Sequence, residues 1–428
     1  MKTVPIRYLI DSKECRLLES LAKLDFDDDG LDENFFEEFI FRKLFRKMDE
    51  YNNNSFFMKN KYLYYLSDGA IAYLEAIGSM RKDLNNSDKI EIDEVVRIVK
   101  EKIKDYKEYD FVSLGCGDGE KDFKIISKLN DGYNPTYIPI DVSPQLLQLT
   151  INYFTDKNIN KNTFYDPSKI YAINCDFFDF SDTLKADLLE IGNRKPKIYT
   201  CLGGTIGNYR EEALLNKFSQ IMDKDDYLVI SFDLYNSDFK FENYIKKYLT
   251  HANIEFLINP LKLIPKFKGY LENRTRYFKF YPEEGEPPIR ISDIDEGLSF
   301  APNFIIPYDR VKKIYVAWTT KYLYKKIHDF FENRSQFEFE DGRVEGNKYF
   351  VLLKKKEISD NKRKAIERLK DLRRTEAGES NKIDEIINYI EKTNPEPIEL
   401  IEKAISCAYS VIKQYFEIHI SKSLSKGG

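Results

Sequence analysis

Residues 110–141 read DFVSLGCGDGEKDFKIISKLNDGYNPTYIPID. The apolar run at 111–114 is typical of a buried parallel strand, and a second apolar strand at 137–140 ends on Asp141. Between them lie a glycine-rich turn at 115–119 and a helix expected over 121–129. This order forms the βαβ unit of a nucleoside-binding fold, in which the glycines let the backbone approach a ligand and the acid accepts hydrogen bonds from ribose hydroxyls.

The composition of the glycine turn indicates which nucleoside it takes. It reads G-C-G-D-G, which is neither the G-x-G-x-x-G that binds a pyrophosphate at a helix N-terminus nor a P-loop. Asp118 and Glu120 would repel a pyrophosphate, but their charge suits the cation S-adenosylmethionine (SAM). A flavodoxin-like sheet with a glycine turn and no cofactor is the alternative that these residues alone leave open.

Composition excludes several classes of function. The 428 residues are 42% hydrophobic with a net charge of −5, so they can bury a large core but offer no overall attraction to nucleic acid. No apolar run reaches the roughly 18 residues of a membrane span, and the first residues have too short an apolar core for a secretory signal. Five scattered cysteines without a CxxC pair predict reduced thiols and a cytoplasmic protein, and three distant histidines argue against a histidine metal site or a Ser–His–Asp triad.

Strand and helix patterns alternate from residue 110 to 233, which predicts a doubly wound, mostly parallel α/β sheet of Rossmann type. Ligands bind such sheets at the carboxyl ends of the strands, here 115–118, Asp141, Asp176, 203–208 and Asp233. We expect five regions: an N-terminal helical segment (1–88) that contributes to a substrate domain, a SAM-binding domain (89–235), a β-rich substrate-domain insertion (236–320), a return to the sheet (321–356) and a C-terminal helical hairpin (357–428).

The C-terminal extension carries two patterns. Residues 354–374 hold ten Lys or Arg and four Asp or Glu, a net charge of +6, which indicates a solvated helix or a docking face for an acidic partner or RNA. Residues 401–416 place apolar side chains on one helical side, so this helix would pack on the enzyme, on a second copy of the chain as a homodimer, or on a protein partner.

Over residues 58–356 the chain resembles the histidine-specific SAM-dependent methyltransferase family, whose best-known members methylate the α-amine of histidine. The resemblance covers most of the chain and rests on five motifs in combination. These are KYLYY at 61–65 with Gly69, SLGCGDGEK at 113–121, YIPIDVS at 137–143, Asp176-Phe177, and LGGTIGN at 202–208.

The resemblance implies roles for the residues of these motifs. Gly115, Gly117, Lys121 and Gly203 would bind the cofactor with Asp141 at the ribose and with Asp176 and Phe177 at the adenine, Gly115 and Lys121 holding the methionine end. Tyr64 and Asn208 would be the catalytic pair that holds the substrate's amine and carboxylate near the methyl group. The remaining chemistry is alignment of a neutral amine with an activated methyl group.

One departure from the family concerns the substrate. Members that use histidine carry E-x-S-x-K in a late strand, whose Glu and Ser grip the imidazole; here the segment reads Ala317-Trp318-Thr319-Thr320-Lys321. A site that has lost its acceptor for a substrate N–H loses that preference. Thr319 would then contact another substrate, and Trp318 either lines the altered pocket or is a core residue.

The sequence therefore predicts a SAM-dependent N-methyltransferase for a small amine or amino-acid-like molecule other than histidine. Two alternatives stay open: a SAM-binding interaction protein with weak or lost catalysis, and a protein or RNA methyltransferase that docks its substrate on residues 354–374.

Overall fold

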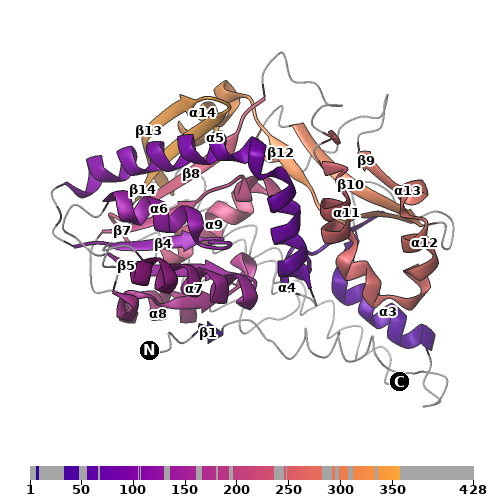
Figure 1. Cartoon of the computed structure of the whole chain (residues 1–428). Helices are drawn as coiled ribbons and strands as arrows, with labels where there is room; N and C mark the ends of the chain where they lie inside the picture. The colour runs from indigo at the N-terminus through magenta and orange to yellow at the C-terminus, as the bar shows by residue number, and fades with distance from the viewer. Residues whose placement is uncertain are drawn as a thin grey trace, which may run out of the picture.

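A computed structural model gives the fold (Figure 1). It describes residues 6–8, 33–47, 55–65, 68–104, 106, 108–129, 135–160, 166–179, 182–191, 196–235, 245–246, 248–281, 292–294, 298–306, 312–332 and 336–356. The patterns noted at 357–428 lie outside these residues. Among the described helices, none combines the length and the apolarity needed to cross a membrane.

The main sheet has eight strands in the order β1-β6-β5-β4-β7-β8-β14-β13. Strands from β1 to β8 are parallel, and β14 runs antiparallel between β8 and β13. This confirms the doubly wound sheet. The strands are β1 (Ile6–Tyr8), β4 (Asp110–Leu114), β5 (Thr136–Asp141), β6 (Ala172–Asn174), β7 (Lys197–Cys201), β8 (Tyr227–Asp233), β13 (Phe337–Glu345) and β14 (Lys348–Lys355).

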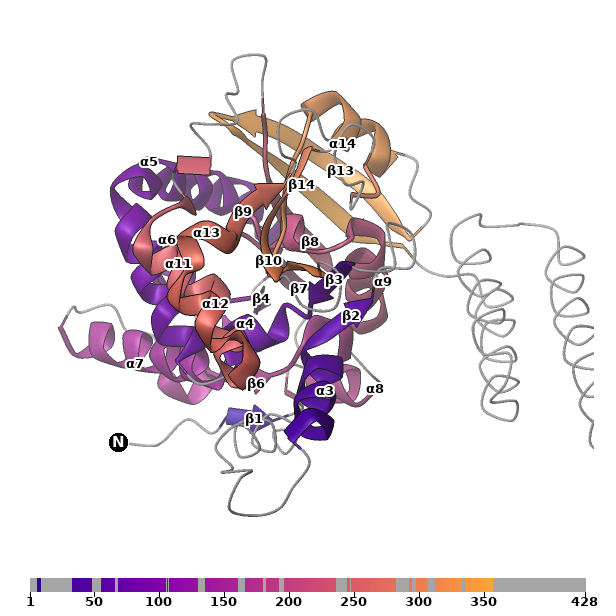
Figure 2. The same cartoon turned by 90° about the vertical axis from the view of Figure 1, so that its right-hand side faces the viewer.

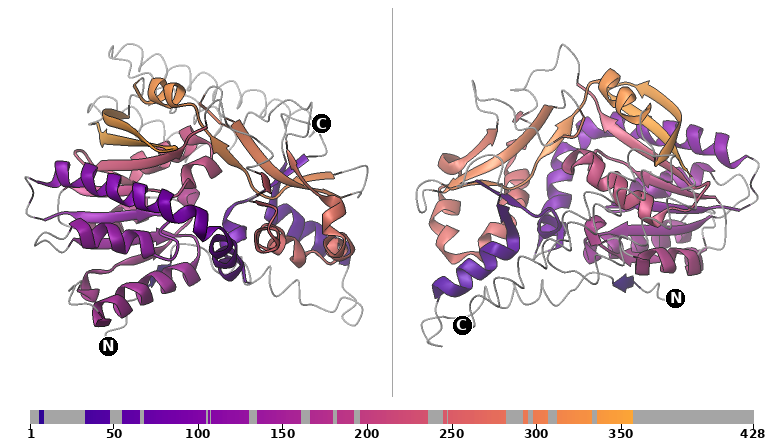
Figure 3. Two further views of the ribbon diagram at one scale, coloured as in Figure 1. Left: turned by 45° about the horizontal axis from the view of Figure 1, so that its top comes forward. Right: turned by 180° about the vertical axis from the view of Figure 1, so that it is seen from behind.

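Helices cover both faces of this sheet because its central strands are apolar on both sides (Figures 1 and 3). One core contains residues of α5 (Gly69–Ile103), α6 (Glu120–Leu129) and α7 (Pro144–Asn160). The opposite core contains residues of α8 (Asp182–Ile191), α9 (Glu211–Ile221) and α14 (Tyr324–Glu332). The carboxyl ends of β4, β5, β6 and β7 are therefore left for a ligand.

Helix α5 is longer than expected. The sequence indicates a helix after Gly69 and a separate one over 90–106, but the structure has one helix of 35 residues. The stretch between them contains no proline, and its single glycine, Gly78, costs a helix only about 1 kcal/mol. The first turns of α5 pack in a third core with the N-terminal segment and the insertion, whereas its second half packs on the main sheet.

A second sheet of six strands stands beside the first (Figures 2 and 3). Its order is β12-β10-β11-β3-β2, with β9 also paired to β10. The parallel pairing of β3 with β11 brings the N-terminal segment into the same sheet as the insertion. The strands are β2 (Phe45–Lys47), β3 (Ser55–Met58), β9 (Phe278–Tyr281), β10 (Leu298–Ile306), β11 (Lys312–Tyr315) and β12 (Thr319–Lys321); α3 (Glu33–Leu44) and α4 (Lys61–Tyr65) flank them in the chain.

The insertion is less purely β than predicted. Residues 251–277 form α11 (His251–Ile258), α12 (Lys268–Glu272), α13 (Arg274–Tyr277) and two short 3-10 turns, η4 (Asn259–Leu263) and η5 (Pro265–Phe267). Helix α11 begins where the Thr250 hydroxyl accepts a hydrogen bond from the Asn253 N–H. The near-alternation of polar and apolar residues over 273–281 predicts a strand, but only its second half forms β9, because α13 occupies the polar first half. The sequence does not indicate strand β13, because its charged residues interrupt the apolar pattern of a strand. It forms a hairpin with β14.

Gly119 gives a test of the turn that follows β4. Its φ is +74°, and a Cβ there would lie 2.6 Å from Cγ2 of Thr150 on α7. We expect Gly119→Ala to lower the free energy of unfolding by about 2 kcal/mol or more, because a left-handed alanine costs about 1–2 kcal/mol before any clash. Gly78→Ala in α5, where a Cβ meets nothing within 4 Å, is the control and should raise stability by about 0.5–1 kcal/mol. Equal urea midpoints for the two variants would contradict this account.

Candidate active site

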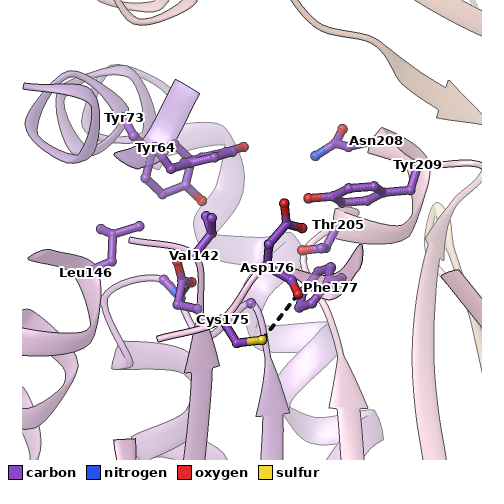
Figure 4. Close-up of a pocket in the computed structure, with 13 residues that line it drawn as sticks. Tyr64, Tyr73, Val142, Leu146, Cys175, Asp176, Phe177, Thr205, Asn208 and Tyr209 are labelled. Atoms are coloured by element: carbon purple, nitrogen blue, oxygen red, sulfur yellow. Dashed lines mark hydrogen bonds between the residues drawn. The ribbon is translucent and has the colours of Figure 1, made fainter. Parts of the chain in front are cut away.

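A pocket of about 510 Å³ opens at the carboxyl ends of the parallel strands (Figure 4). Helix α4, the first turns of α5, the glycine turn and the loops after β5, β6 and β7 all contribute to it. It is lined by Tyr64, Tyr73, Gly115, Gly117, Asp141, Val142, Leu146, Cys175, Asp176, Phe177, Thr205, Asn208 and Tyr209. Seven of the predicted site residues are in this set: Tyr64, Gly115, Gly117, Asp141, Asp176, Phe177 and Asn208.

The glycine turn leaves room at the floor of the pocket. Gly115 has a φ of +78°, and a Cβ on it would lie 3.4 Å from the ring of Phe177 and 3.5 Å from Cγ2 of Thr205. A side chain at this position would fill the space beside Phe177. The bare backbone therefore lets a ligand lie directly against the turn, as the sequence predicts.

Asp141 is held rigidly by the backbone around it. Its carboxylate accepts hydrogen bonds from the N–H groups of Gly117, at 3.0 Å, and Ser143, at 2.9 Å. Burial raises the pKa of Asp141 to about 6, although these N–H groups lower it. The Val142 N–H also lowers this pKa, and the Cys116 thiol lies 4.0 Å from Oδ2, so of about four acceptor positions Asp141 keeps about one for a ribose hydroxyl.

Asp176 and Phe177 follow β6 and form the next part of the wall. The Asp176 carboxylate accepts from the Phe178 N–H at 3.1 Å, and its backbone carbonyl accepts from the Cys175 thiol, the dashed line in Figure 4. The ring of Phe177 is buried and packs at 5.6 Å from that of Tyr209. A carboxylate beside an aromatic ring suits a flat base that carries an exocyclic amine.

Tyrosines form two facing sides at the mouth of the pocket. Figure 4 shows Tyr64 and Tyr73 on one side and Asn208 and Tyr209 on the other. The Tyr64 ring packs on Tyr73 at 5.2 Å and on Phe256 at 5.3 Å. Burial, and then the charge of Asp141, raise the pKa of Tyr64, so its hydroxyl stays protonated.

Asn208 lies in the 3-10 turn η3 (Thr205–Asn208) that follows β7. Its backbone carbonyl accepts a hydrogen bond from the Asn60 side chain at 2.6 Å. Asn60 directly precedes α4, the helix that carries Tyr64, so this bond connects the two sides of the mouth. Burial, and then Asp176, raise the pKa of the neighbouring Tyr209, which also stays protonated.

Four predicted residues lie outside this lining. Lys121 forms ion pairs with Asp88 and Glu91, and its ammonium lies 3.5 Å from where a Cβ of Gly203 would be. Trp318 is buried and packs edge-on against Phe57 at 5.4 Å, in the core of the second sheet. Thr319 lies on β12, and its hydroxyl is next to Gly207, the residue before Asn208.

Sequence reasoning missed six residues of the lining, but several had a signal. Tyr73 belongs to the tyrosine-dense segment that also holds Tyr64, and Tyr209 directly follows the LGGTIGN loop. The remaining four had weaker signals: Val142 and Cys175 are each next to a predicted residue, Thr205 is inside the LGGTIGN loop, and Leu146 is on α7.

Asp141 predicts a pH dependence of stability. Its folded pKa, about 6, lies above the ordinary 3.8, so its ionisation destabilises the folded state progressively as pH rises from about 4 to 6 and costs nothing below that window. Two pKa units correspond to about 3 kcal/mol. The free energy of unfolding of Asp141→Asn minus that of wild type should therefore increase by about 2 kcal/mol between pH 4 and pH 6.5, because part of the effect is already present at pH 4.

Urea unfolding at the two pH values measures this difference. Asp93→Asn is the control, because that carboxylate is half exposed and pairs with Lys128 at the surface. A difference for Asp141→Asn that stays constant with pH would show that Asp141 titrates normally.

Comparison with known proteins agrees with this pocket. Residues 90–264 match the model of a family described as histidine-specific, SAM-dependent methyltransferases. No curated protein sequence matches the chain. One similar solved structure is a 1,6-didemethyltoxoflavin-N1-methyltransferase of Burkholderia thailandensis, with 8% sequence identity and a TM-score of 0.34; the match covers 66% of this chain and 90% of that protein. Another is a SAM-dependent methyltransferase of Methanosarcina mazei, with 13% sequence identity and a TM-score of 0.32; the match covers 59% of this chain and 96% of that protein. TM-scores this low add nothing about function. Over residues 90–264 the chain is therefore similar to the SAM-dependent methyltransferases that are described as histidine-specific.

Proposed function

We propose that this chain transfers the methyl group of SAM to the nitrogen of a small amine or amino-acid-like molecule other than histidine. One observation carries the proposal. Tyr64 and Asn208, which are 144 positions apart in the sequence, lie on opposite sides of a pocket that Gly115 and Asp141 also line. A substrate between them would lie directly above the cofactor.

The described residues of the pocket fit SAM. The bare turn at Gly115 leaves space for the ligand, Asp141 keeps acceptor capacity for the ribose, and Asp176 with Phe177 suits the adenine. Among the described lining residues, two are carboxylates and none is Lys, Arg or His, so the potential in the pocket favours a cation. When bound, SAM supplies a methyl group activated by its sulfonium charge.

Tyr64 and Asn208 would orient the substrate. The raised pKa of Tyr64 keeps its hydroxyl protonated, so it can donate to a substrate carboxylate or accept from an amine, but it cannot serve as the base. The Asn208 side chain offers both a donor and an acceptor from a turn that Asn60 anchors. The amine would therefore enter in its neutral form, and the residues contribute mainly alignment.

The segment before β12 argues against histidine. The position of the family's Glu is Ala317, which packs with the apolar core of the second sheet, and Trp318 is buried in that sheet. Thr319, beside the turn that carries Asn208, is the polar residue of this segment that we assign to the substrate side. A hydrogen-bonding imidazole would lose its acceptor here, which costs such a substrate strongly.

A methyl-transfer screen tests the proposal. Purified protein is incubated with SAM and a panel of amines and amino acids, and S-adenosylhomocysteine and methylated products are quantified by mass spectrometry. We expect a small amine to be methylated, histidine to be inert, and Asn208→Ala to lower kcat/KM by about tenfold or more with SAM affinity unchanged. SAM binding without transfer to any small molecule of the panel or of a cell extract would contradict the proposal.

Restoring the family residues should change the substrate. We expect the double variant Ala317→Glu, Thr319→Ser to gain measurable methylation of histidine, because it restores an acceptor and a hydroxyl for the imidazole. Ala317→Gln with Thr319→Ser, which has similar shape without the charge, is the control. Histidine turnover by wild type equal to that of the Glu variant would show that Ala317 does not decide specificity.

A further inference from the structure

We infer that Glu91 is a positioning residue for the end of the pocket that takes the amino-acid part of SAM. It fixes the ammonium of Lys121 and the backbone of Gly203. This inference rests on the cofactor assignment and on the roles proposed for these two residues. Glu91 itself would not touch the cofactor; it would act through its partners.

Glu91 is completely buried although it lies on a helix that covers the sheet. Its carboxylate accepts hydrogen bonds from the Ser231 hydroxyl on β8, from the Gly203 N–H at 3.0 Å and from Lys121. Lys348 on β14 lies 3.6 Å away. One carboxylate therefore connects α5 with α6, the loop after β7, and two strands of the main sheet.

Charge compensation keeps Glu91 ionised. Burial would raise the pKa of Glu91, but Lys121 and Lys348, with the hydrogen bonds of Lys121 and Ser231, outweigh it and lower the pKa to about 2. A fixed anion at this point orients the Lys121 ammonium. Asp88 holds the same ammonium from the opposite, more exposed side at 3.0 Å.

Lys121 keeps capacity for a ligand. An ammonium has three N–H donors, and within the described part of the chain two carboxylates accept from it. Its side chain is 23% exposed, so one donor can face a bound carboxylate. It lies in the first turn of α6, directly after the glycine turn.

Glu91 and its partners Lys121, Gly203, Ser231 and Lys348 adjoin the pocket through the loop after β7. Gly203 lies beside Lys121, and Thr205, two residues further on, lines the pocket against Gly115. A change at Glu91 would release both Lys121 and the Gly203 backbone at this end, whereas Asp141 and Asp176, which take the ribose and adenine, have other partners. Glu91 should therefore influence one part of the cofactor and not the rest.

Two ligands separate this role from a purely structural one. S-adenosylhomocysteine carries the amino-acid part, whereas 5′-methylthioadenosine has the same adenosine and sulfur without it. By calorimetric titration we expect Glu91→Gln to weaken binding of S-adenosylhomocysteine about ten- to a hundredfold, since hydrogen bonds to charged groups are lost, and to leave 5′-methylthioadenosine unchanged. Glu94→Gln is the matched control: it is a buried glutamate on the same helix whose partner is Arg97, and both ligands should bind it as they bind wild type.

Further variants keep the inference testable if Glu91→Gln folds poorly. Ser231→Ala removes one donor to Glu91 without a change of charge, and it should weaken the binding of S-adenosylhomocysteine but not that of 5′-methylthioadenosine. Lys121→Met should reproduce the loss, and adding Glu91→Gln to it should cost little more. If Glu91→Gln weakens the binding of both ligands equally, or weakens the binding of neither, the inference is overturned while the methyltransferase assignment stays in place. Wild-type protein that binds neither ligand would overturn both.

Discussion

The arrangement of the two sheets depends on a largely buried network of alternating charges, in which the lysines are buried and Asp233 is partly exposed. Asp233, at the end of β8, pairs with Lys321 from β12 of the second sheet and, at 2.8 Å, with Lys348 from β14. Burial would raise the pKa of Asp233, but the two lysines outweigh it and hold that pKa far below the usual range. Removing one member of a fully buried pair costs about 3–5 kcal/mol, and the partial exposure of Asp233 lowers that cost here, but the network still favours one placement of β12 against the main sheet.

The pocket follows from that placement. Its floor belongs to the main sheet, where parallel strands end together, but its mouth needs residues from the lobe beside it. Tyr64 and Tyr73 come from helices that pack with the second sheet's core, and the Asn60–Asn208 hydrogen bond connects them to the loop after β7. A methyl transfer that relies on alignment requires this junction to be rigid, because misplacement of the acceptor by about 1 Å can cost a hundredfold in rate.

The pocket also shows a compromise between stability and binding. Among the described residues, backbone N–H groups and the Cys116 thiol face the buried Asp141 carboxylate and no cation pairs with it, so burial raises its pKa. Such a carboxylate costs folding free energy, yet it leaves about one acceptor position for a ligand. Glu91 shows the opposite solution, because lysines neutralise it and lower its pKa. The difference fits a binding role for the first and a supporting role for the second.

The sequence by itself determined the parallel sheet, the glycine turn and the positions of Asp141, Asp176 and Asn208. These features follow from apolar periodicity and turn chemistry within a few residues, and the ends of parallel strands meet at one edge. It did not predict the continuous α5, the helices of the insertion or the role of Glu91. Only the tertiary structure decided that Trp318 packs in the core and that Lys121 pairs with Glu91 and Asp88. Those outcomes depend on contacts between segments far apart in the chain, which no local pattern records.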